Sequence, residues 1–421
     1  MGGKAFENAV SDGGRPISTP RISPGDYIRL RDTYLQLFQA YFATSKVGVL
    51  KEAPGKTDYG DIDFVVATES QPDFYQLAVY VGAAGLIFES PHMCSLAVNK
   101  DGTRFDDSLM VYKNGKKSML PTSQSGIEST QIDIEIVPPS LLEWHLFYAS
   151  YGDLGGLIGR IVTKLGFTLR NTGLFLRMKQ LDDSKSHSYQ NISDQDGSVF
   201  LSNNPRHVME FLGLSFDTYD SQFGTVDELY KWLGTCPLLS TYTIQIQSRN
   251  SNERHRESKR SVYSNFFSTW LPINLAPNKN DWHHDSNLSE EDVINERRAT
   301  ALKEALVFFD KKGEYGTKHA LVERKIDSMT AAFLAKPIVA QSSGKSDKSI
   351  RDILKGFRRF TGVGDDFKPY ILAIPHSDDD SEVGMLLGPD KKHFEDPRGI
   401  EVWLKANWET LLSLERLRIK T

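Results

Sequence analysis

The segment Asp61-Ile62-Asp63-Phe64-Val65-Val66 constrains the fold of this chain more than any other feature. Polar and apolar residues alternate over its first half, and its second half is wholly apolar, which is typical of a strand inside a sheet. Side chains two apart on a strand point the same way, so Asp61 and Asp63 share one face. Burying two like charges costs several kcal/mol per ion unless a cation neutralises them. The segment therefore predicts a central strand with a site for Mg²⁺ or Mn²⁺.

A second segment, residues 131–137, repeats this pattern. Asp133 and Glu135 share one face of the expected strand, and three isoleucines share the other. We expect the two strands to be neighbours whose carboxylates converge on one metal site, with a spare carboxylate as proton acceptor. The alternative is that Asp133 and Glu135 lie on the wet face of an antiparallel edge strand.

The length and the net charge of the chain limit the classes of protein to which it can belong. The 421 residues suffice for two or three domains, and 50 basic against 55 acidic residues give a net charge of -5, so no overall field attracts nucleic acid or anionic lipid. Two cysteines, Cys94 and Cys236, are too few for a disulfide framework and predict buried thiols in a reducing compartment. No apolar run approaches the roughly 20 residues that span a bilayer, and the first residues lack a signal peptide. We expect an intracellular protein, cytoplasmic or nuclear, with no membrane partner.

The order of helix and strand signals divides the chain into five parts. Residues 1–25, rich in Gly and Pro, predict a flexible leader. Residues 26–140 mix helix and strand patterns, as expected of an α/β or α+β domain built on a mixed sheet. Residues 141–245 predict a helical middle domain, residues 246–288 a basic polar linker, and residues 289–421 a mostly helical C-terminal domain. The predicted fold class is therefore α+β, a mixed-sheet domain followed by mostly helical domains.

Capping signals predict individual helices along the later part of the chain. Asp153 opens one, Thr225 with Glu228 forms a capping box on another, and Asp396 precedes a final helix. A strand pair is expected at residues 370–374 and 383–387.

Other candidate sites are weaker. Gly55-Lys56-Thr57 ends like a phosphate-binding P-loop, but its first glycine is absent and no helix is expected after it, so we reject a Walker ATPase and retain Lys56 as a point charge near a phosphate. His283-His284 is expected to lie in a polar linker. Basic residues at 249–260 and on the helix at 349–360 are expected to form solvated surface.

The order of a short strand, a Gly-Lys turn, Gly60-Asp61-Ile62-Asp63 and a distant Gln131-Ile132-Asp133 strand resembles the nucleotidyltransferase fold of the DNA polymerase β superfamily. The likeness is closest to a branch of uncharacterised phage-type and filamentous-fungal proteins, through residues 1–6, 151–155, 173–174 and 211–214. It covers about residues 1–235, and it implies that residues 26–140 are a nucleotidyltransferase-like catalytic domain.

This resemblance implies a reaction and a site. Asp61 and Asp63 would bind two Mg²⁺ (or Mn²⁺) ions with the phosphates of a nucleoside triphosphate, and Asp133 would complete the site. An acceptor hydroxyl would attack the α-phosphate, and pyrophosphate would leave. From the residues themselves we expect Asp133, near the acceptor, to take its proton. The acceptor, whether RNA, protein or small molecule, stays open.

One departure from the family pattern leaves alternatives open. Where family enzymes have Gly-Ser, this chain has Glu52 and Ala53, and a carboxylate beside a triphosphate is repulsive. Either the nucleotide is held by Gly55 and Lys56, with Gly60 as a further nucleotide-binding residue, or the fold persists without activity and binds nucleotide, nucleic acid or a protein partner. A phosphodiester or phosphate hydrolase using the same carboxylates on water is a third reading.

Overall fold

The computed structural model describes residues 3–10, 17–105, 109–114, 127–182, 197–240, 244, 254, 257–275, 289–377, 379–388, 394 and 396–419. The chain forms two compact units, Met1–Phe175 with Leu201–Ala301, and Leu176–Phe200 with Leu302–Thr421. The finer division into five parts stays a prediction. The linker predicted at residues 246–288 lies mostly outside the described residues, and so does the His283-His284 motif.

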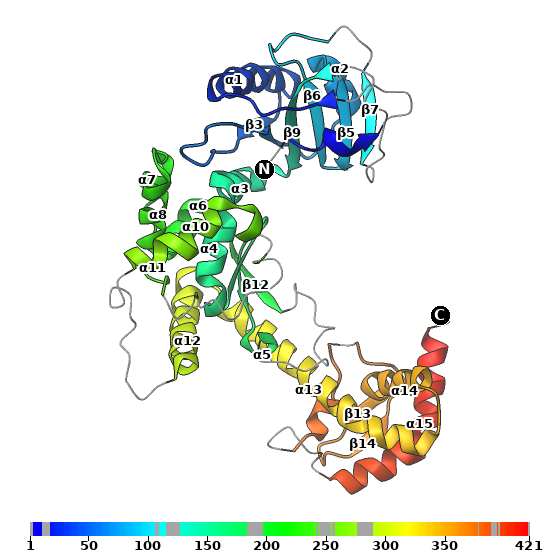
Figure 1. Cartoon of the computed structure of the whole chain (residues 1–421). Coiled ribbons are helices and arrows are strands. Elements are labelled where there is room, and N and C mark those ends of the chain that lie inside the picture. Colours follow the sequence, from blue (N-terminus) through cyan, green and yellow to red (C-terminus); the bar gives the residue numbers. More distant parts are fainter. Residues whose placement is uncertain are drawn as a thin grey trace. The chain divides into compact units, whose positions relative to one another are not determined.

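The chain has the predicted α+β fold, and its first unit is built on a seven-stranded mixed sheet with the order β1-β7-β5-β6-β9-β4-β3 (Figure 1). Strands β4 and β9 run parallel, and β3 and β6 flank this pair in antiparallel orientation. Both acidic strands are therefore internal, so the edge-strand alternative for β9 is wrong. The strands are β1 (Ala9–Val10), β3 (Lys46–Val49), β4 (Asp61–Ala67), β5 (Gly85–Ser90), β6 (Met93–Val98), β7 (Met110–Asn114) and β9 (Thr130–Val137).

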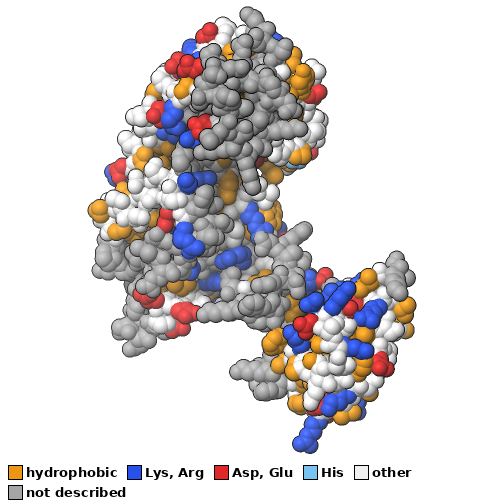
Figure 2. All heavy atoms as spheres, turned by 45° about the vertical axis from the view of Figure 1, so that its right-hand side comes forward, with side chains coloured by type: hydrophobic (Ala, Val, Ile, Leu, Met, Phe, Trp, Pro, Cys, Tyr) orange, Lys and Arg blue, Asp and Glu red, His pale blue; other side chains and the backbone are white. Residues whose placement is uncertain are grey.

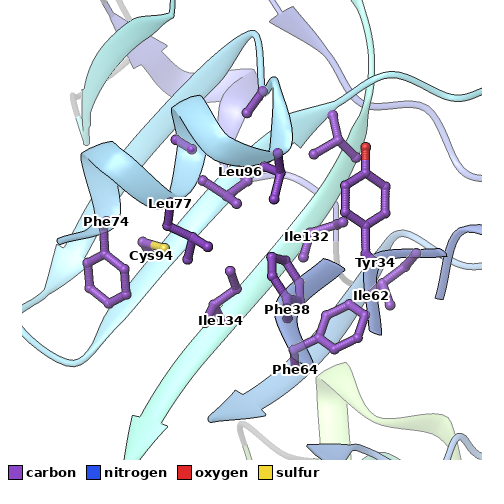
Figure 3. Packing of buried hydrophobic residues seen from close by; sticks show 14 of the residues in the cluster. Tyr34, Phe38, Ile62, Phe64, Phe74, Leu77, Cys94, Leu96, Ile132 and Ile134 are labelled. Carbon is purple, nitrogen blue, oxygen red and sulfur yellow. The ribbon is translucent and has the colours of Figure 1, made fainter. Parts of the chain in front are cut away.

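Helices α1 (Pro24–Tyr41) and α2 (Phe74–Val81) cover one face of this sheet. Ser23 caps α1 and Asp73 caps α2 through side-chain oxygens that accept backbone N–H groups. Every second residue of β4, β6 and β9 enters the core beneath these helices, and the Phe38 ring meets the Phe64 ring edge-on at 4.9 Å (Figure 3). This alternation turns Asp61, Asp63 and Asp133 toward the other face of the sheet.

Two small apolar clusters lie on that second face. One contains Phe6, Ile17, Ile87 and Ala97, and the other contains Val65, Ala67, Val137 and Leu142. The prediction that residues 1–25 form a flexible leader is wrong for the described part of that segment. It contributes buried side chains to the core and the strand β2 (Ile17–Ser18), which pairs with β8 (Ile127–Glu128).

Mostly helical structure follows the sheet, as predicted. Asp153 accepts a hydrogen bond from the Gly156 N–H at the start of α4, and Thr225 accepts one from the Glu228 N–H at the start of α8, so both predicted caps are confirmed. The elements are α3 (Leu142–Ala149), α4 (Leu154–Val162), β10 (Phe167–Arg170), β11 (Gly173–Arg177), α5 (Lys179–Asp182), β12 (Ser198–Ser202), α6 (Pro205–Phe211), α7 (Phe216–Asp220), α8 (Val226–Gly234), α10 (Ser261–Asn265), α11 (Leu271–Asn274) and α12 (Glu290–Phe308).

The last part of the chain packs three helices and a short strand pair. Asp396 caps the final helix as predicted. The strand predicted at residues 383–387 is wrong: Val383–Leu386 forms a 3₁₀ helix, because the two buried residues Val383 and Leu386 lie one turn apart rather than alternating. The elements are α13 (Lys312–Ser343), α14 (Asp347–Phe360), β13 (Thr361–Val363), β14 (Pro369–Ile371) and α15 (Pro397–Arg418).

Among the residues that the structure describes, the basic side chains on the face seen in Figure 2 are scattered among hydrophobic and acidic ones. On α14, Arg351 and Lys355 are exposed, whereas Arg359 pairs with the buried Glu415 at 2.5 Å. Cys94 and Cys236 are both free and buried, as expected. None of the helices that the structure describes combines the length and the apolar character needed to cross a membrane.

Candidate metal centre

Three carboxylates from two strands meet on the second face of the sheet. In the parallel pair β4 and β9, Asp63 lies directly opposite Asp133, and Asp61 lies two residues earlier on the same face. Each of the three offers a carboxylate oxygen, and these oxygens lie within 4.8 Å of one another. The predicted convergence of Asp61, Asp63 and Asp133 is therefore confirmed.

Asp63 occupies the least favourable position for a charge. Burial raises its pKa well above the ordinary value, and the negative charges of Asp61 and Asp133 raise it further. Among the residues that the structure describes, none donates a hydrogen bond to this carboxylate. Hard divalent cations prefer oxygen ligands, so a cation among the three carboxylates would remove this repulsion.

Asp133 is held by two neighbours on the sheet. The Ser95 hydroxyl donates to its Oδ1 at 2.6 Å, and the Gln131 amide donates to Oδ1 and Oδ2 at 2.9 and 3.0 Å. Burial raises the pKa of Asp133 to about 6, although both hydrogen bonds favour the charged form. These contacts fix the carboxylate in one orientation toward Asp63.

Asp61 receives its hydrogen bond from a distant part of the sequence. The Gly3 N–H donates to its Oδ2 at 3.0 Å. Burial raises the pKa of Asp61, and this hydrogen bond opposes the rise.

The predicted phosphate-binding turn carries its own ion pair. Lys56 pairs with Glu52, and the Tyr27 hydroxyl donates to Glu52 at 3.1 Å. The Lys56 charge lowers the pKa values of Asp61 and Asp63, whereas the Glu52 charge raises them. Lys56 therefore acts electrostatically on the carboxylates of the candidate metal centre, and Glu52 partly neutralises it. The expected role of Lys56 beside a phosphate stays a prediction.

The two glycines predicted to bind nucleotide differ in their surroundings. Gly55 has φ +75° and nothing within 4 Å of where a Cβ would lie, so the space beside it is open. Gly60 lies against Gly3, whose Cβ would be 2.1 Å from the Gly60 carbonyl oxygen. Glu135 is not one of the three clustered carboxylates, and pairs instead with His145 at 3.0 Å.

The residues that donate hydrogen bonds to the carboxylates were not among the predicted site residues. Gln131 carries a recoverable signal, because it lies two residues before Asp133 and so shares its face. Ser95 lies on β6, a strand that was not predicted although Met93–Val98 is a short run of mostly apolar residues. No local pattern connects Gly3 with Asp61, because 58 residues separate them.

Comparison with known proteins adds no further constraint: no protein-family profile and no curated protein sequence matches the chain. The chemistry of the centre follows from its donors. Three converging carboxylates with one nearby lysine are suited to hold divalent metal ions against the phosphate groups of a ligand.

Proposed function

We propose that this protein is a metal-dependent nucleotidyltransferase, which moves a nucleoside monophosphate from a nucleoside triphosphate to an acceptor hydroxyl on RNA, a protein or a small molecule. The observation that supports it is the meeting of Asp61, Asp63 and Asp133 on parallel strands of a mixed sheet. The resemblance to the polymerase β superfamily at these three positions supports the same assignment.

In the proposed mechanism, Asp61, Asp63 and Asp133 hold Mg²⁺ or Mn²⁺. When bound, the metal stabilises negative charge on the reacting phosphate oxygens. The acceptor hydroxyl attacks the α-phosphorus, the bond to the pyrophosphate oxygen breaks, and Asp133 accepts the hydroxyl proton. Lys56 supplies a positive charge to the phosphates, and Gly55 and Gly60 are the proposed nucleotide-binding glycines.

An assay of the full-length protein tests this proposal. Each of the four NTPs, labelled on the α-phosphate, is incubated with Mg²⁺ or Mn²⁺ and a fractionated cell extract as the source of acceptors. We expect pyrophosphate release and transfer of label into one fraction. The Asp61→Asn/Asp63→Asn variant should lose at least about 100-fold of this rate, whereas the exposed charge control Asp32→Asn should keep it. Unchanged Mn²⁺ affinity in the double variant would contradict the metal centre.

A catalytically silent protein is the second candidate, and the Glu52–Lys56 ion pair favours it. In this case the chain binds Mn²⁺ and a nucleotide, nucleic acid or protein partner, and none of the four NTPs gives pyrophosphate. Release of a nucleoside monophosphate or inorganic phosphate without label transfer would instead identify a hydrolase.

A further inference from the structure

A strap of residues 3–6 crosses the second face of the sheet beside the carboxylates. Its far end is anchored by Phe6, which is 3% exposed and packs with Ile17, Ile87 and Ala97. Its near end is anchored by the Thr19 hydroxyl, which donates a buried hydrogen bond of 2.7 Å to the Gly3 carbonyl. The strap is thus fixed at both ends by contacts that do not involve the carboxylates.

The near end of the strap makes direct contact with one carboxylate. The Gly3 N–H donates to Asp61 Oδ2 at 3.0 Å. Gly3 has φ +80°, a conformation that favours glycine, and a Cβ at this position would lie 2.1 Å from the Gly60 carbonyl oxygen. Any other residue at position 3 must therefore move the backbone N–H that Asp61 accepts.

The middle of the strap reaches a second carboxylate through one side chain. The Ala5 N–H donates to Gln131 Oε1 at 3.0 Å, which fixes the orientation of the Gln131 amide. The amide nitrogen must then face the other way, where it donates to both oxygens of Asp133. Reversing the amide would place its oxygen against the Asp133 carboxylate.

We propose that this strap is a positioning element of the metal centre, in which Gly3 orients Asp61 and Gln131 orients Asp133. The inference rests on the proposed function, because it takes these carboxylates as metal ligands. Groups that hydrogen-bond to a metal ligand fix its direction, and their loss typically weakens metal binding about 10- to 100-fold. Gly3 and Gln131 are positioning residues and do not touch the metal themselves.

Mn²⁺ binding to the full-length protein tests the strap, measured by electron paramagnetic resonance and calorimetry together with the midpoint of thermal unfolding. Gly3→Ala displaces the N–H that Asp61 accepts, and Gln131→Met removes both amide contacts at similar length. We expect each variant to bind Mn²⁺ about 10- to 100-fold more weakly than the wild type. The matched control is Val81→Ala, which trims the core beneath α2 on the opposite face of the sheet and touches no part of the strap. It should lower the unfolding midpoint and leave Mn²⁺ affinity unchanged.

The outcomes separate this inference from the proposed function. Wild-type Mn²⁺ affinity in folded Gly3→Ala or Gln131→Met would overturn the strap while leaving the metal centre intact. An equal loss of affinity in Val81→Ala would also overturn it, because the effect would then follow stability alone. If Gly3→Ala does not fold, Gln131→Met decides the question. Failure of the wild type to bind Mn²⁺ at all would remove the metal centre and the strap's role together.

Discussion

The three carboxylates of the candidate metal centre repel one another when no cation lies between them, and this repulsion lowers the stability of the metal-free protein. The Asp63 carboxylate is partly buried beside Asp61 and Asp133, and the Glu52 charge also acts on it. Protonation removes part of the repulsion, and so does a bound cation. Stability of the metal-free protein should therefore depend on pH through these groups.

The pKa of Asp133 defines the pH range over which the free energy of unfolding should change. Its pKa is about 6 in the folded protein against an unperturbed value of 3.8, so the folded state holds the proton more tightly. The contribution to stability is fully present below about pH 4 and is lost as pH rises through 6, by an amount on the order of 3 kcal/mol. We expect Asp133→Asn to flatten the fall in unfolding free energy between these pH values. Urea unfolding in EDTA at a series of pH values measures it, and Asp32→Asn is the control. Parallel curves for the wild type and Asp133→Asn would contradict the expectation.

The negative charge of Glu52 is expected to weaken the binding of a phosphate ligand. This charge would repel a triphosphate at the proposed nucleotide site, and it holds Lys56 in an ion pair. We expect Glu52→Gln to bind a Mn²⁺ complex of a non-hydrolysable ATP analogue about tenfold more tightly, equivalent to about 1.4 kcal/mol. Isothermal titration calorimetry measures the change against Asp32→Asn. Weaker binding by Glu52→Gln would mean that Glu52 is needed to place Lys56.

Some helices could be predicted from the sequence, and others could not. Helix starts are local, because a cap and the N–H group that it accepts lie within four residues, so Asp153, Thr225 and Asp396 could be recognised from the sequence alone. The 3₁₀ helix at Val383–Leu386 could not, because four residues are too short to separate a helical spacing from an alternating one.

The alternation of polar and apolar residues predicts that both acidic segments are strands. Their pairing was expected because both strands carry carboxylates that could bind one metal ion, not because of any pattern in the sequence. The register that puts Asp63 opposite Asp133 joins residues 70 positions apart. The strand β6, which puts Ser95 opposite Asp133, was not predicted at all. Sequence reasoning therefore found the three carboxylates, whereas two of their hydrogen-bond partners, Ser95 and Gly3, come from pairings that no short segment encodes.

At the scale of the whole molecule, the division into two compact units has a thermodynamic consequence. All three carboxylates belong to the unit formed by Met1–Phe175 and Leu201–Ala301. A ligand stabilises only the part that binds it, by about 2.7 kcal/mol at 100 times its dissociation constant.

Differential scanning calorimetry should therefore resolve two transitions, of which Mn²⁺ raises one. We expect a rise of roughly 5 °C in that transition and none in the other. Asp61→Asn/Asp63→Asn should abolish the shift. A single transition that moves as a whole with Mn²⁺ would show instead that the two units unfold together.

The carboxylates lie between two apolar clusters on the same face of the sheet, Phe6 with its neighbours on one side and Val65 with its neighbours on the other. Dissolved salt screens charges that face open water and leaves partly buried ones largely unscreened. We therefore expect that a high concentration of potassium chloride does not replace the proposed divalent ion. Buffers used to store or crystallise the protein should contain magnesium or manganese rather than rely on ionic strength.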